Sequence, residues 1–260
     1  MMNKAAFFDI DGTIWDMNTN IPDSTREALR LLKENGVYTF ICSGRAPAFL
    51  GNPKLHELGF DGIVAGCGTY VLFHGEELLC HFIEPKLVKK TVDILRSHGL
   101  GVLLEGKNFQ YMDEKVKEDR YYPFLKKELG DKLVLLDDYD MAWEANKFTA
   151  MLAGDQWQDA LEELKQWYHI IIQDGVVCEG VPLGFSKASG IQFICEKLNV
   201  ARENVYAFGD GPNDIEMIEY AGCGIAMGNG RDVVKDIADY VTDRLDEDGI
   251  YNACRHFGLI

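Results

Sequence analysis

Two short runs of the chain group carboxylates, glycines and an amide in an order that could do chemistry. The first is Asp9-Ile10-Asp11-Gly12-Thr13, and the second is Gly209-Asp210-Gly211-Pro212-Asn213-Asp214. Each run directly follows a short apolar segment, residues 5–8 in one case and 205–208 in the other. Carboxylates gathered at close range repel each other by roughly 4 kcal/mol per pair at an effective dielectric near 20, so such a group needs a cation.

Hard oxygen ligands with room for water suit Mg²⁺, which leaves coordination positions for a substrate phosphate. The candidate ligands are the carboxylates of the two runs: Asp9, Asp11, Asp210 and Asp214. Two further features indicate a phosphate. Ser43-Gly44 offers a hydroxyl and unhindered backbone amides, and Lys187 is predicted in the first turn of a helix, where the macrodipole disfavours a cation.

Each of these motifs also has an ordinary structural interpretation. Residues 9–12 could form a turn, and residues 209–214 a strand-to-helix loop with a capping aspartate. A calcium loop fits poorly, because the glycine is in the fourth position and Asn20 stands where a glutamate is needed. Ser43-Gly44 could be a simple turn and Lys187 a solvated lysine. Chance explains one such cluster more easily than several.

Apolar strand-like segments alternate with amphipathic helix-like segments, which is typical of a parallel sheet. Strands are expected at residues 5–8, 37–42, 62–65, 205–208 and 223–226, with a hairpin over 70–73 and 78–82. Helices are expected from residue 22 to about 34 and over 186–198, 212–220 and 231–239. Ligands bind beyond the carboxyl ends of such strands, so the polar runs should meet at one edge.

Residues 83–184 have a different pattern. Helices are expected at 87–98 and 157–168, strands at 102–104, 147–152 and 170–173, and an acidic, aromatic stretch covers 113–140. We therefore expect an α/β protein whose Rossmann-like, doubly wound and mostly parallel core is built from residues 1–82 and 185–260. Residues 83–184 would be an inserted α+β domain.

The bulk composition excludes several classes of partner. A net charge of −16 over 260 residues repels nucleic acid and anionic membranes. We expect no signal peptide and no membrane span, because no apolar run approaches the required length. Seven cysteines without a C-x-x-C pair indicate a reducing, cytoplasmic location and argue against a zinc site. The order of Gly224, Gly228 and Gly230 does not match a dinucleotide-binding motif.

Together these segments resemble the haloacid dehalogenase superfamily, in particular its Cof-type phosphatases with a class IIB cap. Residues 9–13, Ser43-Gly44-Arg45, Lys187 and residues 209–214 match its four motifs in order. The chain departs from the pattern in three places. Serine replaces the commoner threonine in the second motif, Ala188 replaces the usual glycine after the lysine, and residues 65–69 replace an Asn-Gly-Ala sequence.

The resemblance implies a Mg²⁺-dependent phosphatase that acts on a small phosphorylated metabolite such as a sugar phosphate. Asp9 would be the nucleophile that forms an aspartyl-phosphate, Asp11 the general acid and base, and Lys187 a catalytic cation. The implied metal site comprises Asp9, the main-chain carbonyl of Asp11, and Asp210, with Asp214 assisting. The implied phosphate-binding residues are Ser43, Gly44, Arg45 and Asn213.

The resemblance also implies that the inserted domain is a lid that selects the substrate, and residues 179–184 are candidates for that role. Other reactions stay open at this point. The aspartyl-phosphate could pass to a second substrate, as in a phosphotransferase or phosphomutase, or persist, as in a phospho-acceptor signalling domain. A non-catalytic binding protein is a third alternative. No protein partner is expected, and the chain would be a monomer or a weak homo-oligomer.

Overall fold

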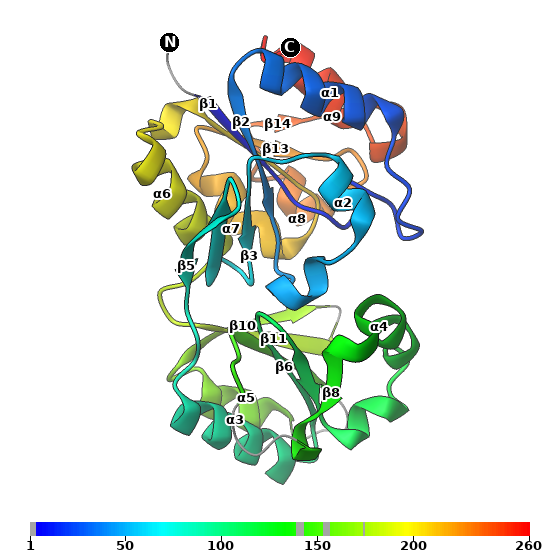
Figure 1. Ribbon diagram of the computed structural model, residues 1–260, viewed down its shortest axis with the longest axis vertical. Coiled ribbons are helices and arrows are strands. Elements are labelled where there is room, and N and C mark those ends of the chain that lie inside the picture. Colours follow the sequence, from blue (N-terminus) through cyan, green and yellow to red (C-terminus); the bar gives the residue numbers. More distant parts are fainter. Residues whose placement is uncertain (1–3, 139–142, 153–156, 174) are drawn as a thin grey trace. The chain divides into compact units, whose positions relative to one another are not determined.

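A computed structural model describes residues 4–138, 143–152, 157–173 and 175–260, so residues 1–3 and the last two residues of the acidic stretch, 139 and 140, lie outside it (Figure 1). The chain forms two compact units. Unit 1 comprises the residues up to Gly44, His56–Leu78 and Ser186–Ile260, and unit 2 comprises Arg45–Leu55 and Leu79–Phe185. The sequence predicted an insert of residues 83–184, which does not contain residues 45–55. These domain limits stay a proposal.

Unit 1 is built on a sheet with the strand order β14-β13-β12-β1-β2-β3-β4-β5. Neighbouring strands from β14 to β3 are parallel, and β4 is antiparallel to β3. The strands are β1 (Lys4–Phe8), β2 (Val37–Cys42), β3 (Gly62–Ala65), β4 (Tyr70–Phe73), β5 (Glu76–Cys80), β12 (Val205–Gly209), β13 (Cys223–Ala226) and β14 (Tyr240–Val241).

Helices flank this sheet, with α1 packed against α9 and α6 against α7 (Figure 1). The helices are α1 (Asp23–Glu34), α6 (Lys187–Leu198), α7 (Ile215–Tyr220), α8 (Asp232–Lys235) and α9 (Gly249–His256), and α2 (Pro53–Glu57) lies where the two units meet in sequence. Short 3₁₀ turns are η5 (Arg202–Asn204), η6 (Pro212–Asp214) and η7 (Leu245–Glu247).

The central strand β1 is apolar because both of its faces are covered. Phe7 stacks on Phe40 of β2 with ring centroids 4.8 Å apart, and Phe8 stacks on Phe208 of β12 at 4.7 Å. All four rings are buried. Strands that are buried on both faces read as continuous hydrophobic runs, which explains why the sequence predicted β1, β2 and β12.

Unit 2 contains a separate sheet with the order β10-β11-β9-β6-β7-β8. Its strands are β6 (Gly101–Glu105), β7 (Gln110–Met112), β8 (Leu133–Leu135), β9 (Lys147–Met151), β10 (Tyr168–Gln173) and β11 (Val177–Pro182). Its helices are α3 (Pro85–Ser97), α4 (Tyr122–Leu129) and α5 (Trp157–Leu164), with 3₁₀ turns η1 (Pro47–Leu50), η2 (Glu114–Glu118), η3 (Gly130–Lys132) and η4 (Leu136–Asp138).

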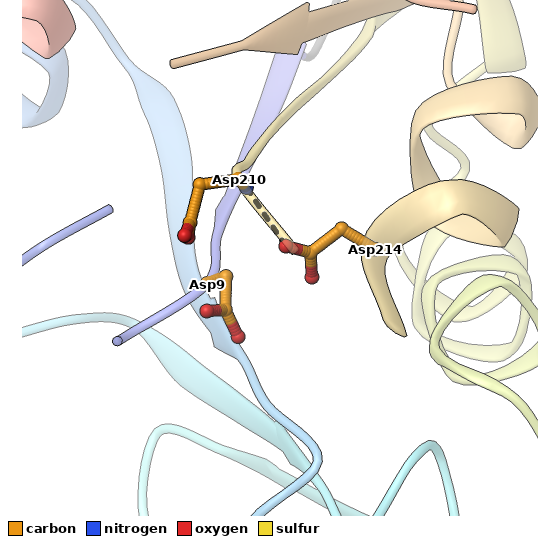
Figure 2. Close-up of side chains that lie close together, drawn as sticks. All are labelled: Asp9, Asp210 and Asp214. Carbon is orange, nitrogen blue, oxygen red and sulfur yellow. Dashed lines mark hydrogen bonds between the residues drawn. The ribbon is translucent and has the colours of Figure 1, made fainter. Parts of the chain in front are cut away.

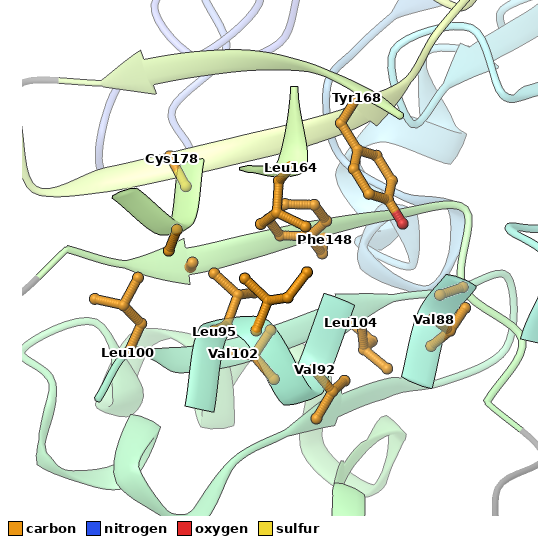
Figure 3. Close-up of a cluster of buried hydrophobic side chains, with 14 of the residues drawn as sticks. Val88, Val92, Leu95, Leu100, Val102, Leu104, Phe148, Leu164, Tyr168 and Cys178 are labelled. Atoms are coloured by element: carbon orange, nitrogen blue, oxygen red, sulfur yellow. The ribbon is translucent and has the colours of Figure 1, made fainter. Parts of the chain in front are cut away.

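One face of the unit 2 sheet carries a buried apolar cluster between the strands and helices α3 and α5 (Figure 3). Phe148 of β9 is at its centre and meets the ring of Tyr168 edge-on at 4.9 Å. Val88, Val92 and Leu95 extend from α3 toward the sheet (Figure 3). This packing anchors the unit independently of the other core.

The opposite face of the same sheet carries buried charges. Lys147 forms ion pairs with Glu179 and, at 3.2 Å, with Glu105, and Thr149 donates a hydrogen bond to Glu105 at 2.6 Å. The three strands β6, β9 and β11 place these side chains on one face through their antiparallel register. Glu179, the first residue of the segment predicted to select substrate, therefore belongs to a buried ionic group.

The predicted fold class is confirmed, and the differences concern element limits. The helix predicted at 157–168 ends at Leu164, because Tyr168 begins β10 and is buried in the core. Among the described helices and strands, those that had no sequence prediction are β7, β8, β11, β14, α2, α4 and α9. Within the described ranges, no helix is both long enough and apolar enough to cross a membrane.

Truncating Phe148 tests the importance of the unit 2 cluster. Phe148→Ala should lower the free energy of unfolding by about 3–5 kcal/mol, because the ring is fully buried and its removal leaves a cavity. Urea denaturation of the full-length protein measures this loss of unfolding free energy. The matched control is Phe124→Ala, since Phe124 is 40% exposed and its truncation should cost about 1 kcal/mol or less. Equal losses in the two variants would contradict the assignment.

Candidate active site

The sheet of unit 1 brings the two acidic runs together. β1 ends at Phe8 and β12 ends at Gly209, and the two strands are parallel neighbours with Phe8 paired to Phe208. The amide of Asp9 donates to the carbonyl oxygen of Phe208 at 2.9 Å, which continues the ladder one residue past the strand. Asp9 and Asp210 therefore leave the same edge of the sheet, as predicted.

Three carboxylates converge at this edge. Ligand oxygens of Asp9, Asp210 and Asp214 all lie within 4.8 Å of one another (Figure 2). Asp9 is 5% exposed and Asp214 is fully buried. At such separations and an effective dielectric near 20, each charged pair repels by roughly 3–4 kcal/mol. The fold holds this arrangement only because cations and hydrogen-bond donors offset the repulsion.

Lys187 supplies one of those cations. Its ammonium group lies 2.6 Å from Oδ1 of Asp9 and also contacts Oδ1 of Asp214. Lys187 is the first residue of α6, as predicted, and the hydroxyl groups of Ser186 and Ser189 form a capping box there. A cation at a helix N-terminus is unfavourable on its own, so the two carboxylates are what stabilise Lys187 in this buried position.

The burial of these charges shifts their pKa values. Burial, and next the charge of Asp214, raise the pKa of Asp9 well above its usual range even though Lys187 opposes them. Burial and Asp214 likewise raise the pKa of Asp210 to about 7. Burial would lower the pKa of Lys187, but the carboxylates of Asp214 and Asp9 keep it well above its usual value. The cluster of Asp9, Asp210, Asp214 and Lys187 therefore favours the uptake of positive charge, either as a proton or as a cation.

Asp214 also organises the loop that carries Asp210. Oδ2 of Asp214 accepts hydrogen bonds from the amides of Asp210 and Gly211, both at 2.9 Å (Figure 2). Its other oxygen faces Lys187. Because both oxygens have donors, Asp214 is better suited to holding the loop and the lysine than to being the principal ligand of an ion.

The first acidic run contacts the second directly. Gly12 has a left-handed φ of +88°, and a Cβ at this position would lie 2.3 Å from Oδ2 of Asp210. Only glycine permits this approach. The next residue, Thr13, is buried and donates its hydroxyl to Oδ1 of Asp210 at 2.9 Å. This pair of residues fixes where the Asp210 carboxylate points.

The side chain of Asp11 is arranged differently from those of the other acids. It is exposed and accepts a hydrogen bond from the indole Nε1 of Trp15 at 2.9 Å. It is not among the three carboxylates that converge in Figure 2. The Asp11 carboxylate, one of four candidate metal ligands in the sequence, therefore lies outside the converging group. The resemblance implied a metal contact through the main-chain carbonyl of Asp11 instead.

The predicted phosphate-binding residues lie in several loops. Ser43 is buried directly after β2, and its amide donates to the carbonyl oxygen of Val64 at 2.8 Å. Gly44 follows it at the end of this segment of unit 1, and Asn213 is half-buried in η6. Arg45 belongs to unit 2, where its guanidinium lies 4.5 Å from the ring centroid of Phe49.

The departure at residues 65–69 is structurally tied to the second motif. Cys67 has a left-handed φ of +53°, and its amide donates to the carbonyl oxygen of Ser43 at 3.2 Å. The turn after β3 therefore supports the loop that contains Ser43. The hydrogen bond between Cys67 and Ser43 uses main-chain atoms, so it does not require the asparagine that the family pattern has in this segment.

Three residues of this region were not predicted from the sequence: Thr13, Trp15 and Asn229. Asn229 donates to the carbonyl oxygen of Gly12 at 2.8 Å and accepts from the amide of Leu245 at 2.8 Å. It therefore links the turn after β1 to the first residue of η7. Asn229 lies in the glycine-rich segment after β13, whose sequence was interpreted only as a poor match to a dinucleotide-binding motif. The polar side chain of Asn229 is the signal that could have identified it.

The donor set fits a hard divalent cation. Carboxylate oxygens from three residues lie within 4.8 Å of one another, and the pKa values of two of those residues, Asp9 and Asp210, are raised by burial and, next, by the charge of Asp214. Oxygen ligands of this kind are those that Mg²⁺ prefers. Cysteine and histidine ligands are not part of this group in the described residues.

Comparisons with known proteins agree with this geometry. A family model described as haloacid dehalogenase-like hydrolase matches residues 6–254. The Bacillus subtilis protein YkrA is 34% identical over 269 residues, which cover 100% of both chains. The B. subtilis 5-amino-6-(5-phospho-D-ribitylamino)uracil phosphatase YcsE is 29% identical over 266 residues, covering 98% of this chain and 96% of YcsE. The solved HAD subclass IIB sugar phosphatase BT4131 superposes with a TM-score of 0.86 at 30% identity, covering 99% and 100% of the two chains.

Removing one carboxylate should stabilise the metal-free protein. Because the pKa of Asp210 is higher in the native state than when unfolded, the native state loses stability as pH rises from about 4 to about 7. Asp210→Asn should therefore raise the free energy of unfolding at pH 8 by about 1–3 kcal/mol and leave it little changed at pH 4. Urea unfolding in a chelator at both pH values measures the difference. A variant that is less stable than the wild type at pH 8 would contradict the expected repulsion.

Proposed function

The chain belongs to the haloacid dehalogenase-like hydrolases and is a phosphatase, and from this premise we propose that it hydrolyses a small phosphorylated metabolite through an aspartyl-phosphate on Asp9. The predicted family is thereby confirmed. The single observation that carries the mechanism is the position of Asp9, which lies at the end of the central strand between Lys187 and Asp210. The ammonium group of Lys187 already neutralises part of the charge on this carboxylate, and Asp210 would help to hold a Mg²⁺ ion that neutralises more.

The reaction has two steps that use the same pair of aspartates. In the first, a carboxylate oxygen of Asp9 bonds to phosphorus as the ester P–O bond breaks, and Asp11 gives its proton to the leaving oxygen. In the second, water attacks the same phosphorus as its bond to Asp9 breaks, and Asp11 takes the proton from that water. Free phosphate and the two original aspartates result, so each atom and proton is accounted for.

The cationic groups neutralise charge on the transferring phosphoryl group. Lys187 is already bound to Asp9 and would shift part of its interaction to a phosphoryl oxygen. Ser43, Gly44, Arg45 and Asn213 are the further residues that we assign to phosphate binding. Catalysis of this kind depends chiefly on positioning and on electrostatic stabilisation.

The residues that would hold Mg²⁺ are Asp9, Asp11 through its main-chain carbonyl, Asp210 and, less directly, Asp214. The ion would supply Lewis acidity and neutralise negative charge on the phosphoryl oxygens. Thr13 and Gly12 keep Asp210 oriented toward that site. The two amide donors to Asp214 keep its loop from relaxing away under the repulsion of the neighbouring carboxylates.

We assign substrate selection to unit 2 and the substrate class to sugar phosphates or similar phosphomonoesters. The support is the similarity to BT4131, which is named a sugar phosphatase, and to YcsE, whose named substrate carries a phosphorylated ribityl chain. In both cases the phosphate is attached to a hydroxyl-rich organic group. A panel of phosphorylated metabolites assayed for free phosphate identifies the substrate.

Replacing the nucleophile should abolish turnover. Asp9→Asn is expected to lower phosphate release from 4-nitrophenyl phosphate by at least about a thousandfold, because a neutral amide cannot form the phosphoenzyme. A colorimetric phosphate assay and a circular dichroism spectrum check activity and fold together. Asp246→Asn is the matched control, since that side chain is 72% exposed and forms a surface ion pair with Arg244. Activity above a few per cent in Asp9→Asn would overturn the mechanism.

Removing divalent cations should also stop turnover. Dialysis against a chelator is expected to reduce the rate by at least about a hundredfold, because the clustered carboxylates then repel the substrate phosphate. Adding back Mg²⁺ should restore the rate, and the measurement is phosphate release against free Mg²⁺. A rate that does not respond to the chelator would remove the metal from the mechanism. Transfer of phosphate to an added sugar without phosphate release would instead indicate a phosphotransferase.

A further inference from the structure

The contact between Trp15 and Asp11 has no part in the mechanism derived so far. The indole Nε1 of Trp15 donates to Oδ1 of Asp11 at 2.9 Å. Trp15 is 1% exposed, whereas Asp11 is exposed. A rigid, buried donor therefore holds one oxygen of the Asp11 carboxylate.

The backbone between the two residues fixes this geometry. The amide of Gly12 donates to the carbonyl oxygen of Trp15 at 2.9 Å, and the amides of Ile14 and Trp15 both donate to Ile10, at 2.9 and 3.1 Å. Asp11 and Trp15 form an isolated β-bridge. The side chains of Ile10 and Ile14 are fully buried. The turn therefore sets the position of the indole nitrogen relative to the carboxylate without needing a ligand.

The chemistry of the donor decides which oxygen can carry a proton. An indole N–H is a donor only, so the oxygen that it contacts acts as an acceptor whether Asp11 is ionised or protonated. The carbonyl oxygen of a carboxyl group is a better acceptor than its hydroxyl oxygen, so the indole bond to Oδ1 favours the acidic proton of Asp11 on Oδ2.

We propose that Trp15 is a positioning residue that directs proton exchange to Oδ2 of Asp11. The inference rests on the proposed function, in which Asp11 is the general acid and base. In the first step the proton leaves Oδ2 for the ester oxygen as the P–O bond breaks and the bond between Asp9 and phosphorus forms. In the second step Oδ2 takes a proton from the attacking water. Oδ1 remains bonded to Trp15 throughout both steps.

The test compares two aryl phosphates of similar size in Trp15→Phe. Phenyl phosphate releases a basic phenolate that needs protonation, whereas 4-nitrophenyl phosphate releases an anion that is stable without it. The first-turnover rate of phenol release should fall by about tenfold or more for phenyl phosphate and by less than about threefold for 4-nitrophenyl phosphate. A structural role alone would lower both rates equally, and that result would overturn the proposal.

A double-mutant cycle with Asp11→Ala identifies the residue through which Trp15 acts. On the Asp11→Ala background, Trp15→Phe should have no further effect on either substrate. A full additional loss would overturn the proposal. Trp167→Phe is the matched control, because it removes an indole from unit 2, where Trp167 packs beside Lys90, and should leave both rates unchanged.

A second measurement keeps the proposal testable if Trp15→Phe does not fold. In ¹⁵N spectra of the wild-type protein and Asp11→Ala, the indole N–H signal of Trp15 should shift and exchange faster with solvent in the variant, while the three other indole signals stay in place. An unmoved Trp15 signal would overturn the contact. The two proposals can fail separately. Activity in Asp9→Asn would defeat the phosphatase mechanism. If Asp9→Asn is inactive and Trp15→Phe lowers the rates with both aryl phosphates equally, only the role of Trp15 is defeated.

Discussion

Electrostatic repulsion among buried carboxylates is the constraint on which the rest of unit 1 depends. Asp9, Asp210 and Asp214 are held within reach of one another by two adjacent parallel strands, and the ammonium group of Lys187 offsets part of their charge. The amide donors to Asp214 and the hydroxyl of Thr13 add further compensation. Burial and the remaining negative charge raise the pKa values of Asp9 and Asp210, and perturbed pKa values of this kind cluster at functional sites.

The sequence predicted the parts of this site that depend on strand ends. Asp9 and Asp210 follow continuous apolar runs, and parallel pairing sends the ends of those strands to one edge of the sheet, so their proximity could be foreseen. The contacts of Trp15 and Asn229 could not, because each depends on the path of a turn rather than on residue type or periodicity. Arg45 shows the same limit, since its position in unit 2 depends on packing against Phe49.

Unit 2 was predicted less fully for a related reason. Its short strands β7 and β8 have three residues each, which is too few for a period of two to be recognised. The helix α5 ends before Tyr168 because that residue is needed in the core beneath the sheet, and tertiary packing overrides the local helical pattern. The buried ions of Lys147 were also unforeseen, since a lysine in a strand is ordinarily solvent-exposed.

The strand order of unit 1 has a consequence for how the protein is made. β1 lies between β2 and β12, and the hydrogen bond from Thr13 to Asp210 joins residues 197 positions apart. At ribosomal speeds of 5–20 residues per second, β12 is synthesised roughly 10–40 s after β1, so one edge of β1 stays unpaired for that time. During that interval Phe8 of β1 lacks its stacking partner Phe208. The group of three carboxylates is accordingly completed only after residues 210–214 have been synthesised.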